Sequence, residues 1–500
     1  MGTIGKQSIT SSLITYVGFI VGAVNTWIFT ANGYFTPDQY GLTRMIFELG
    51  FTLFALASMG SISILYRFYP YYRDRLPSRE RDLFGKMTIL GLAGFVAVSI
   101  ALYFFHDLFI QKFAGNAALM VDYYYILFPF TLCLLLFSLL EAQAWNLRAS
   151  IATVFCKELA LRLLTSLLIG VLLLHWLNFD QFIWLFSMLY GMIALGLFVY
   201  LQRKHGLVFT LKTSYVTQKM AKKMVPYSFF ITVVSFCSIF AKTFDTILIA
   251  SVRDLSYVGI FSYATYLTAI MEAPQRGLIA ASTPVIAQAW KDKDLPRISR
   301  IYKKSAINML IFSGFMFALI ALNFSNSILF LKQDPAYLKG QTAFLILGLT
   351  KVLETGTGLN SQIILTSRYW KVDFLSNVIL LVVLIPLNYM LIKSMGIDGV
   401  ALATFIAYMI FNVLRFVFIW VKFDMQPFTL ATLWAVVVIV ANFFIAKLIQ
   451  VDSPLLEAVL QSIVFVVLSG VMIVKLKVSE DVNRGVDMVV ARVKGLLKRG

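Results

Sequence analysis

Long apolar runs recur along almost the whole chain, and they constrain its fold more than any other feature. A membrane-spanning helix needs about 20 predominantly apolar residues, and the mean hydropathy of +0.81 is too high for a soluble chain of 500 residues. Fourteen runs are long and apolar enough to span, with approximate limits 8–32, 41–66, 85–107, 121–144, 152–176, 181–202, 225–250, 256–280, 305–330, 341–366, 372–393, 398–421, 427–449 and 454–474. We therefore expect an all-α polytopic membrane protein with about 14 transmembrane helices. The first run is too long for the apolar part of a signal peptide, so we expect it to be an uncleaved helix.

The formal net charge is +18, and the placement of the basic residues argues against nucleic acid as a partner. We assume an even number of spans and place Lys6, near the N-terminus, in the cytoplasm. Most lysines and arginines, including Arg415 and Lys422, then fall in loops assigned to the cytoplasm. Outer loops hold few: Lys112, Arg253, Lys332, Lys339, Lys393 and Lys447. This positive-inside distribution predicts a multi-pass protein of the cytoplasmic membrane with both termini in the cytoplasm. The basic loops would also face anionic membrane lipids.

The sequence shows no pattern typical of a metal site, a disulfide framework or a nucleotide site. Cys133, Cys156 and Cys237 all fall within apolar runs, the three histidines are scattered, and no glycine-rich loop is present. We therefore expect no metal and no cofactor, with H⁺ or Na⁺ as the candidate coupling ion.

A weak internal repeat relates the two halves of the chain. The segment TPDQYG (36–41) resembles DLSYVG (254–259), and the same shift of 218 residues aligns Asp180 with Asp398 and Lys204 with Lys422. Parallel six-helix repeats are typical of transporters. The predicted organisation is an N-terminal six-helix lobe (1–202), a basic cytoplasmic linker (203–223), a C-terminal six-helix lobe (224–421), transmembrane helices 13 and 14 (422–474) and a cytoplasmic amphipathic tail (475–500). The valine spacing of the tail predicts a helix on the membrane surface, with binding to a partner as the alternative.

Charged residues interrupt several apolar runs, although each costs about 2.5–3.5 kcal/mol to insert into a membrane and so usually faces a cavity or a partner. The pairs Arg44/Glu48, Lys242/Asp245 and Lys351/Glu354 are each spaced to share one face of a helix. We take as candidate substrate-binding cations Arg44, Arg162, Lys242 and Lys351, and as candidate ion-coupling or charge-partner acids Glu48, Asp245, Glu272 and Glu354.

A cavity with cations from both halves would suit an anionic substrate, because lysine acts as a point charge on phosphate and arginine binds it bidentately. Asp245 and Glu354 are the acids best placed to bind a coupling ion. A purely structural role stays open for Arg44, Lys157 and Glu158, since all three lie near the ends of their runs and pairing within a helix lowers the insertion cost.

Five segments of the chain resemble polysaccharide (O-antigen type) flippases of the multidrug/oligosaccharidyl-lipid/polysaccharide (MOP) exporter superfamily. They are FTPDQYGLTRMIFELG (35–50), the run ending in YRFYPYY (66–72), FDTILIASVRDLSYVGIFSYATYL (244–267), APQRGLIAASTPVIAQAWKDKDLPRISRIYKKS (273–305) and MGIDGVALATFIAYM (395–409). Asp245 and the turn glycines Gly41 and Gly259 match positions that recur in this family. The resemblance covers nearly the whole chain, but none of its segments identifies a substrate.

The resemblance implies a bacterial inner-membrane protein with the MATE-like fold of this superfamily. Such proteins move polyprenyl-pyrophosphate-linked oligosaccharides from the inner to the outer leaflet for O-antigen, lipopolysaccharide and other cell-surface polysaccharide synthesis. It further implies alternating access driven by an ion gradient, with the headgroup crossing a cationic cavity between the lobes. Expected partners are the glycolipid, membrane lipids and other polysaccharide-biosynthesis membrane proteins, and we expect a monomer.

Three other functions remain as alternatives. A multidrug exporter of the same superfamily would use its membrane acids to bind cationic drugs. A membrane glycan polymerase or ligase would need acid and base groups in an outer domain, whereas the longest outer loop, about 108–120, contains Lys112 and no acid. A scaffold without transport activity could share the architecture. We therefore expect a transporter and not an enzyme.

Overall fold

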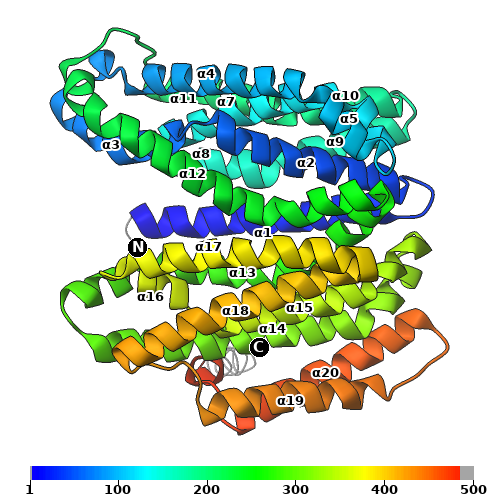
Figure 1. The fold of residues 1–500 in the computed structure, drawn as a ribbon. Helices are drawn as coiled ribbons and strands as arrows, with labels where there is room; N and C mark the ends of the chain where they lie inside the picture. The colour runs from blue at the N-terminus through cyan, green and yellow to red at the C-terminus, as the bar shows by residue number, and fades with distance from the viewer. Residues whose placement is uncertain (1–2, 485–500) are drawn as a thin grey trace, which may run out of the picture. The chain divides into compact units, whose positions relative to one another are not determined.

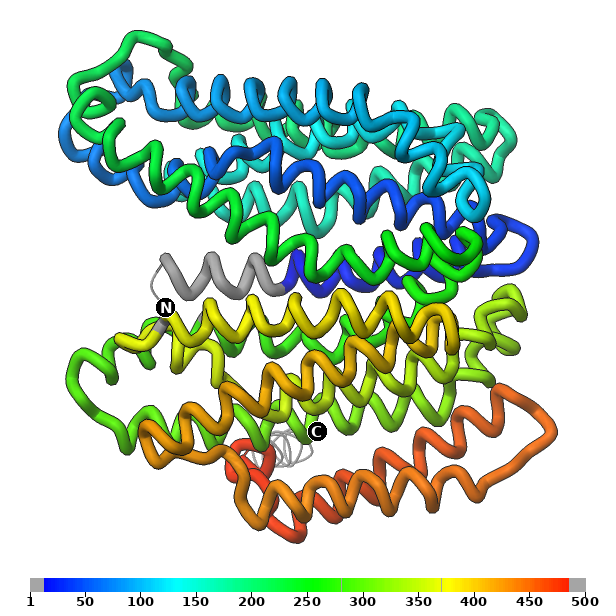
Figure 2. Tube along the Cα trace, viewed as in Figure 1, coloured from blue at the N-terminus to red at the C-terminus, as the bar shows by residue number. Residues whose placement is uncertain are grey.

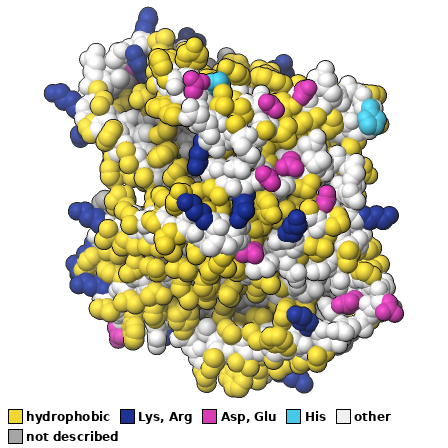
Figure 3. Space-filling model, turned by 45° about the vertical axis from the view of Figure 1, so that its right-hand side comes forward, with side chains coloured by type: hydrophobic (Ala, Val, Ile, Leu, Met, Phe, Trp, Pro, Cys, Tyr) yellow, Lys and Arg dark blue, Asp and Glu magenta, His cyan; other side chains and the backbone are white. Residues whose placement is uncertain are grey.

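The computed structural model describes residues 3–484, and every regular element in this range is a helix (Figure 1). The predicted all-α class is confirmed. Ten of the described helices are long and apolar enough to cross a membrane, and a bent pair of shorter helices makes an eleventh candidate. Hydrophobic side chains cover large parts of the face drawn in Figure 3, and many large apolar residues are exposed, among them Leu167, Leu195 and Val382. These features identify a multi-pass membrane protein.

Packing divides the chain into two compact units, which meet in the sequence at Gly259 and Ile260, within the first turns of α13 (Leu255–Lys291). The first unit contains, besides the start of α13, the elements α1 (Thr3–Thr30), α2 (Pro37–Ala57), α3 (Ser61–Arg75), η1 (Ser78–Glu80), α4 (Leu83–Phe104), α5 (His106–Phe113), α6 (Ala118–Asp122), η2 (Tyr124–Ile126), α7 (Leu127–Asn146), α8 (Ser150–Val154), η3 (Phe155–Ala160), α9 (Leu161–Leu173), α10 (Phe179–Ser187), α11 (Leu189–His205) and α12 (Tyr215–Val252).

The second unit contains the rest of α13 and the elements that follow it. These are α14 (Leu295–Phe330), η4 (Pro335–Gly340), α15 (Gln341–Gly356), α16 (Asn360–Thr366), α17 (Trp370–Met395), α18 (Ile397–Phe423), α19 (Leu430–Lys447) and α20 (Pro454–Lys475). The boundary between the units follows from packing alone, and the lobe limits inferred from the repeat stay a prediction.

The fourteen predicted runs lie largely in helices, and breaks interrupt several of them. The run 41–66 breaks between α2 and α3 at Gly60, whose φ is +70°. The run 152–176 contains the π-helical segment η3 between α8 and α9. The run 181–202 bends by 41° at Met188, between α10 and α11. The run 341–366 breaks after α15 at Gly358, whose φ of +67° suits glycine. The run 256–280 lies within the long helix α13, where Glu272 and Arg276 interrupt the apolar sequence.

Helix α2 organises the first unit, because it packs on α4, α7 and α12. It begins with a capping box, in which Thr36 and Gln39 exchange side-chain-to-backbone hydrogen bonds of 3.2 and 3.0 Å. Its Phe47 ring contacts Phe130 of α7 at 5.1 Å and Tyr190 of α11 at 6.2 Å between ring centroids. The charged residues of α2 are therefore carried on a helix that is packed on several sides.

The turn glycines Gly41 and Gly259 make reciprocal close contacts. A Cβ on Gly41 would lie 2.0 Å from the carbonyl oxygen of Leu255, and one on Gly259 would lie 2.4 Å from that of Pro37. The shift of 218 residues that relates Gly41 to Gly259 also relates Pro37 to Leu255. The two equivalent turns thus meet as a symmetric pair, which requires glycine at both positions.

In the second unit, α14 packs on α15, α19 and α20, and α17 packs on α18 (Figure 2). The first residues of the predicted tail dock on this core, since Val478 and Val482 pack with Leu310 and Val438. Lys304 of α14 also lies 3.3 Å from Glu480. The part of the predicted amphipathic tail from 485 to 500 lies outside the described residues.

Candidate functional site

The first predicted ion pair of the site forms on α2. Arg44 and Glu48 lie one helical turn apart, with 3.7 Å between the Arg44 Nη2 and Glu48 Oε1 atoms. The side chain of Arg44 keeps 39% of its exposure, its guanidinium lies 5.9 Å from the Phe47 ring, and its Nε atom is buried with no hydrogen-bond acceptor. The guanidinium is therefore only partly neutralised by Glu48.

Arg162 lies where α9 packs on α1. Its Nη2 atom is 3.0 Å from Glu158 Oε2, and its guanidinium lies 4.9 Å from the Phe19 ring. Gly18 and Gly22 make room for it, because a Cβ on either would come within about 3.3 Å of Arg162 side-chain atoms. The Nη1 atom of Arg162 is buried, and no acceptor among the described residues bonds to it. One donor of this arginine is thus left without a hydrogen bond in this conformation.

A largely apolar cavity of about 240 Å³ in the first unit contains charges from two different helices. Lys157 of η3 lies 3.5 Å from Glu141 of α7, a carboxylate that sequence reasoning missed. The rest of the lining combines hydroxyl and aromatic side chains with aliphatic ones: Ser58, Ser63, Ser138, Ser235, Phe51, Phe54, Phe137 and Tyr190, together with Ala55, Gly60, Ile62, Leu134 and Ile239. Carboxylate, hydroxyl and aromatic groups together are suited to a polar, hydroxyl-bearing ligand.

The buried Tyr190 lies near these charged groups. It lines the same cavity as Glu141 and Lys157, and it interacts electrostatically with Glu141, Glu158, Arg44 and Arg162. The structure therefore brings together two of the predicted cations, Arg44 and Arg162, in one region of the first unit, together with Glu141, which the prediction omitted.

Lys242 and Asp245 lie on α12, near the Thr243 hydroxyl, which is 2.7 Å from the Thr52 hydroxyl of α2. Lys242 is exposed and Asp245 is half-buried. An exposed lysine in the middle of a membrane-spanning helix must reach water, because contact with lipid is too costly.

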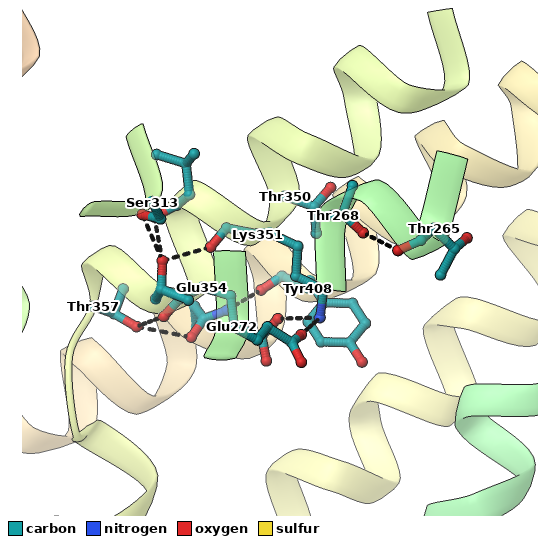
Figure 4. Close-up of polar contacts among 12 residues, drawn as sticks. Thr265, Thr268, Glu272, Ser313, Thr350, Lys351, Glu354, Thr357 and Tyr408 are labelled. Atoms are coloured by element: carbon teal, nitrogen blue, oxygen red, sulfur yellow. Dashed lines mark hydrogen bonds and ion pairs between the residues drawn. The ribbon is translucent and has the colours of Figure 1, made fainter. Parts of the chain in front are cut away.

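The clearest charged cluster lies in the second unit, where Lys351 of α15 is held by two carboxylates (Figure 4). Its Nζ atom lies 2.9 Å from Glu354 Oε2 and forms a second ion pair with Glu272 of α13. The Tyr408 ring of α18 lies 5.6 Å from the same Nζ atom. Each of the three charged side chains keeps about a quarter of its exposure. The structure thus brings together three of the predicted residues.

This cluster carries a formal charge of −1 when all three groups are ionised. Lys351 is therefore already paired with anionic groups before any ligand binds. Beside it, Tyr408, Thr350 and Thr357 line a mainly apolar cavity of about 150 Å³. The Thr357 hydroxyl donates to the Glu354 carbonyl oxygen at 2.8 Å. A proton or a small cation bound at one of the carboxylates would leave Lys351 paired with the other alone.

Arg415 corrects an expectation drawn from the sequence. The charge count assigned it to a cytoplasmic loop, but it lies within α18 and its side chain is only 6% exposed. Its Nη2 atom lies 2.5 Å from Asp373 Oδ1, and its Nε atom donates to the Ser376 hydroxyl at 3.1 Å. The guanidinium also stacks on Phe411 at 3.7 Å from the ring centroid.

No protein-family model and no curated protein sequence matches the chain. Solved structures match it well. The lipid II flippase MurJ in an inward closed conformation aligns with a TM-score of 0.72 at 16% identity, over 94% of this chain and 99% of the flippase. An inward-facing multidrug resistance MATE family transporter of the MOP superfamily aligns with a TM-score of 0.65 at 15% identity, over 83% and 98% of the two chains.

A MOP superfamily transporter from Pyrococcus furiosus, described by the reversed polarity of its binding pocket, aligns with a TM-score of 0.54 at 16% identity, over 84% of this chain and 96% of that one. At sequence identities of 15–16%, the structural similarity establishes a shared fold and no more. The chain therefore has the predicted MOP-type fold, and the proteins that share it here are transporters and a flippase.

Proposed function

We propose that this protein is a flippase that moves a polyprenyl-pyrophosphate-linked oligosaccharide from the inner to the outer leaflet, coupled to a gradient of H⁺ or Na⁺. The substrate class is supported chiefly by one observation. The match to the lipid II flippase extends over nearly the full length of both chains, whereas the matched MATE transporter leaves about a sixth of this chain unaligned. A protein of flippase length and fold, with charged groups inside its helices, suits a lipid whose headgroup is charged.

The Glu272–Lys351–Glu354 cluster supplies a mechanism for coupling. While both carboxylates are ionised they hold Lys351, so a pyrophosphate must compete with them for the ammonium group. Binding of H⁺ or Na⁺ at either carboxylate leaves Lys351 with one competing carboxylate instead of two, and this strengthens anion binding. Because such linkage is reciprocal, the anion in turn strengthens ion binding.

The first unit offers the groups for the rest of the headgroup. Among the described residues, Arg44 and Arg162 each have one buried nitrogen without a hydrogen-bond partner. When transport exposes these nitrogens, both can donate to phosphate oxygens. The cavity around Glu141 and Lys157 presents hydroxyl, carboxylate and aromatic groups to sugar rings. Lys242, exposed on α12, is a further phosphate contact in this proposal, and Glu48 and Asp245 are further sites for the coupling ion.

Cation export is the second candidate, and one observation favours it. Two carboxylates surround the single lysine of the cluster, so this site has a net negative charge when all three groups are ionised. A cationic drug that displaced Lys351 would gain both carboxylates. The same geometry therefore makes opposite predictions for the two substrate classes when Lys351 is removed.

The test is a comparison of binding by the purified protein. A fluorescent polyprenyl-pyrophosphate oligosaccharide and a cationic dye are each titrated against wild type, Lys351→Ala and Lys447→Ala, the last being an exposed lysine at the end of α19. We expect Lys351→Ala to weaken glycolipid binding about tenfold or more, the loss typical of one charge-assisted hydrogen bond, while Lys447→Ala has no effect. Tighter dye binding by Lys351→Ala, with unchanged glycolipid binding, would favour the exporter.

A further inference from the structure

A second pocket, of about 240 Å³, lies between α3 and α12 in the first unit, away from the charged cluster around Tyr190. Its lining comes from only these two helices: Arg67, Phe68 and Tyr71 from α3, and Met220, Lys223 and Tyr227 from α12. Both cations belong to basic segments that the charge distribution predicts to be cytoplasmic. The proposed transport function makes no use of this pocket.

The aromatic residues fix the position of Arg67. Its guanidinium lies 4.4 Å from the Tyr227 ring centroid and 5.8 Å from that of Phe68. A guanidinium stacked on a ring keeps its N–H groups directed outward from its edge, where they can bind a ligand. The arginine is therefore pre-oriented across the interface between the two helices.

Among the residues that the structure describes, no carboxylate lines this pocket, although two cations do. Two positive groups that face one small space repel each other, and an anion between them would replace the repulsion with two favourable interactions. This differs from the Lys351 cluster, where carboxylates already fulfil that role. The pocket thus has the electrostatic character of an anion site.

We propose that this pocket binds the phosphate of an anionic phospholipid headgroup. On the pocket face of α12, the apolar Phe230 follows Tyr227 by about one turn toward the membrane interior and is 50% exposed. An exposed apolar ring beside a cationic, aromatic pocket is the arrangement expected where acyl chains give way to headgroups. A lipid could contact both the pocket and this ring, whereas a free phosphate ion could contact only the pocket.

A bound headgroup would tie α12 to α3. Asp82, fully buried, already accepts hydrogen bonds of 2.7 Å from both Ser214 and Thr217 at the start of α12, and the Tyr72 hydroxyl of α3 lies 2.8 Å from that of Thr217. The phosphate would add a connection one to two turns further along. Its effect is thus to stabilise the packing of α12 on α3, whatever the protein transports.

The experiment measures lipid retained by the full-length protein. Protein purified from membranes that contain equal amounts of phosphatidylglycerol and phosphatidylcholine is analysed by native mass spectrometry, and its thermal unfolding is followed with either lipid or with inorganic phosphate. The variants are Arg67→Gln, Lys223→Gln and the matched control Lys222→Gln, which removes a neighbouring exposed lysine outside the pocket. Arg67→Lys keeps the charge but not the planar guanidinium. It provides a second, milder change at this position in case Arg67→Gln fails to fold.

We expect wild type and Lys222→Gln to retain phosphatidylglycerol in preference to phosphatidylcholine, and each pocket variant to lose about tenfold or more of that binding. The phosphatidylglycerol binding of Arg67→Lys should lie between that of wild type and that of Arg67→Gln. Equal retention of the two lipids, or the same loss in Lys222→Gln as in Arg67→Gln, would overturn the proposal. Stabilisation by inorganic phosphate but by neither lipid would overturn the lipid headgroup as the ligand.

Discussion

Arg415 and Asp373 form the most deeply buried ion pair among the described residues, and their surroundings show why it can exist inside a membrane protein. Ser361 donates to the Asp373 carboxylate at 3.0 Å, Ser376 accepts from the Arg415 Nε atom, and Phe411 covers the guanidinium. Each charge therefore has hydrogen bonds in addition to its partner. Buried pairs of this kind tolerate joint replacement but not the loss of one member.

Removing Arg415 alone should destabilise the protein strongly, because Asp373 would remain buried without its counter-ion. We expect Arg415→Met to lower the free energy of unfolding by about 3–5 kcal/mol, as measured by thermal or denaturant unfolding of the purified protein in detergent. The double variant Asp373→Asn/Arg415→Met should recover most of that loss. A single variant as stable as wild type would show that the pair has no such role.

The two carboxylates of the Lys351 cluster should control how strongly ions affect anion binding. In Glu272→Gln and Glu354→Gln, Lys351 has only one competing carboxylate, so glycolipid binding should be tighter and should depend less on Na⁺ or pH than in wild type. Coupling between sites is typically about 5–150-fold in affinity. Titrating the fluorescent glycolipid over a range of Na⁺ concentrations and pH values measures this dependence. Unchanged ion dependence in both variants would exclude the cluster as the coupling site.

The sequence predicts ion pairs within one helix far better than pairs between helices. Arg44/Glu48 and Lys351/Glu354 could be inferred from spacing alone, and the structure forms both. Glu141 and Arg415 lie inside the predicted runs 121–144 and 398–421, so each carried the same signal as the other interrupting charges and was overlooked. Their partners could not be found from spacing, because Lys157 lies on another helix and Asp373 lies 42 residues from Arg415 in the chain. Spacing along a helix has a fixed geometric meaning, whereas a contact between helices depends on packing that no local pattern contains.

At the scale of single elements, the apolar runs predicted where helices lie but not where they break. Length and hydropathy are enough to require a helix, because backbone groups in lipid must be bonded within their own segment. The π-helical segment η3, the bend at Met188 and the break at Gly358 all lie inside apolar runs. Such breaks are permitted by contacts with neighbouring helices, so they leave little trace in hydropathy. Segment η3 contains Lys157 and Glu158, so two charged residues lie where the helix is irregular.

The contact between the first turns of α2 and α13 should be intolerant of any side chain. In Gly41→Ala the new methyl group would lie 2.0 Å from the Leu255 carbonyl oxygen, so the helices must separate. We expect a cost of about 1–3 kcal/mol, as for other overpacked sites, seen as a lower melting temperature of the purified protein. Gly196→Ala on α11 is the matched control, because no neighbouring atom lies within 4 Å and alanine favours a helix. If both variants melted at the same temperature, the close contact would be refuted.

At the scale of the whole molecule, the fold could be predicted from the sequence more fully than the site. The apolar runs required a multi-span helical protein, and the resemblance of five segments implied the MOP-type fold, which the matching structures share. Gly41 and Gly259, which the proposed repeat relates, make reciprocal close contacts. The charge balance was less predictable, because the acids Glu141 and Asp373 offset cations that seemed unpaired in the sequence. The charge of the substrate therefore does not follow from an excess of cations alone. It depends on which cations separate from their carboxylate partners during transport.

Transfer between leaflets tests the central claim most directly. Vesicles that contain the purified protein and a fluorescent polyprenyl-pyrophosphate oligosaccharide are assayed for exposure of the label on each leaflet, with and without imposed H⁺ or Na⁺ gradients. Wild type is compared with Lys242→Ala, Lys351→Ala and the control Lys447→Ala. We predict gradient-dependent transfer by wild type and the control, and loss of transfer in both Lys242→Ala and Lys351→Ala. No transfer by wild type under any gradient, with expulsion of a cationic dye instead, would contradict the account.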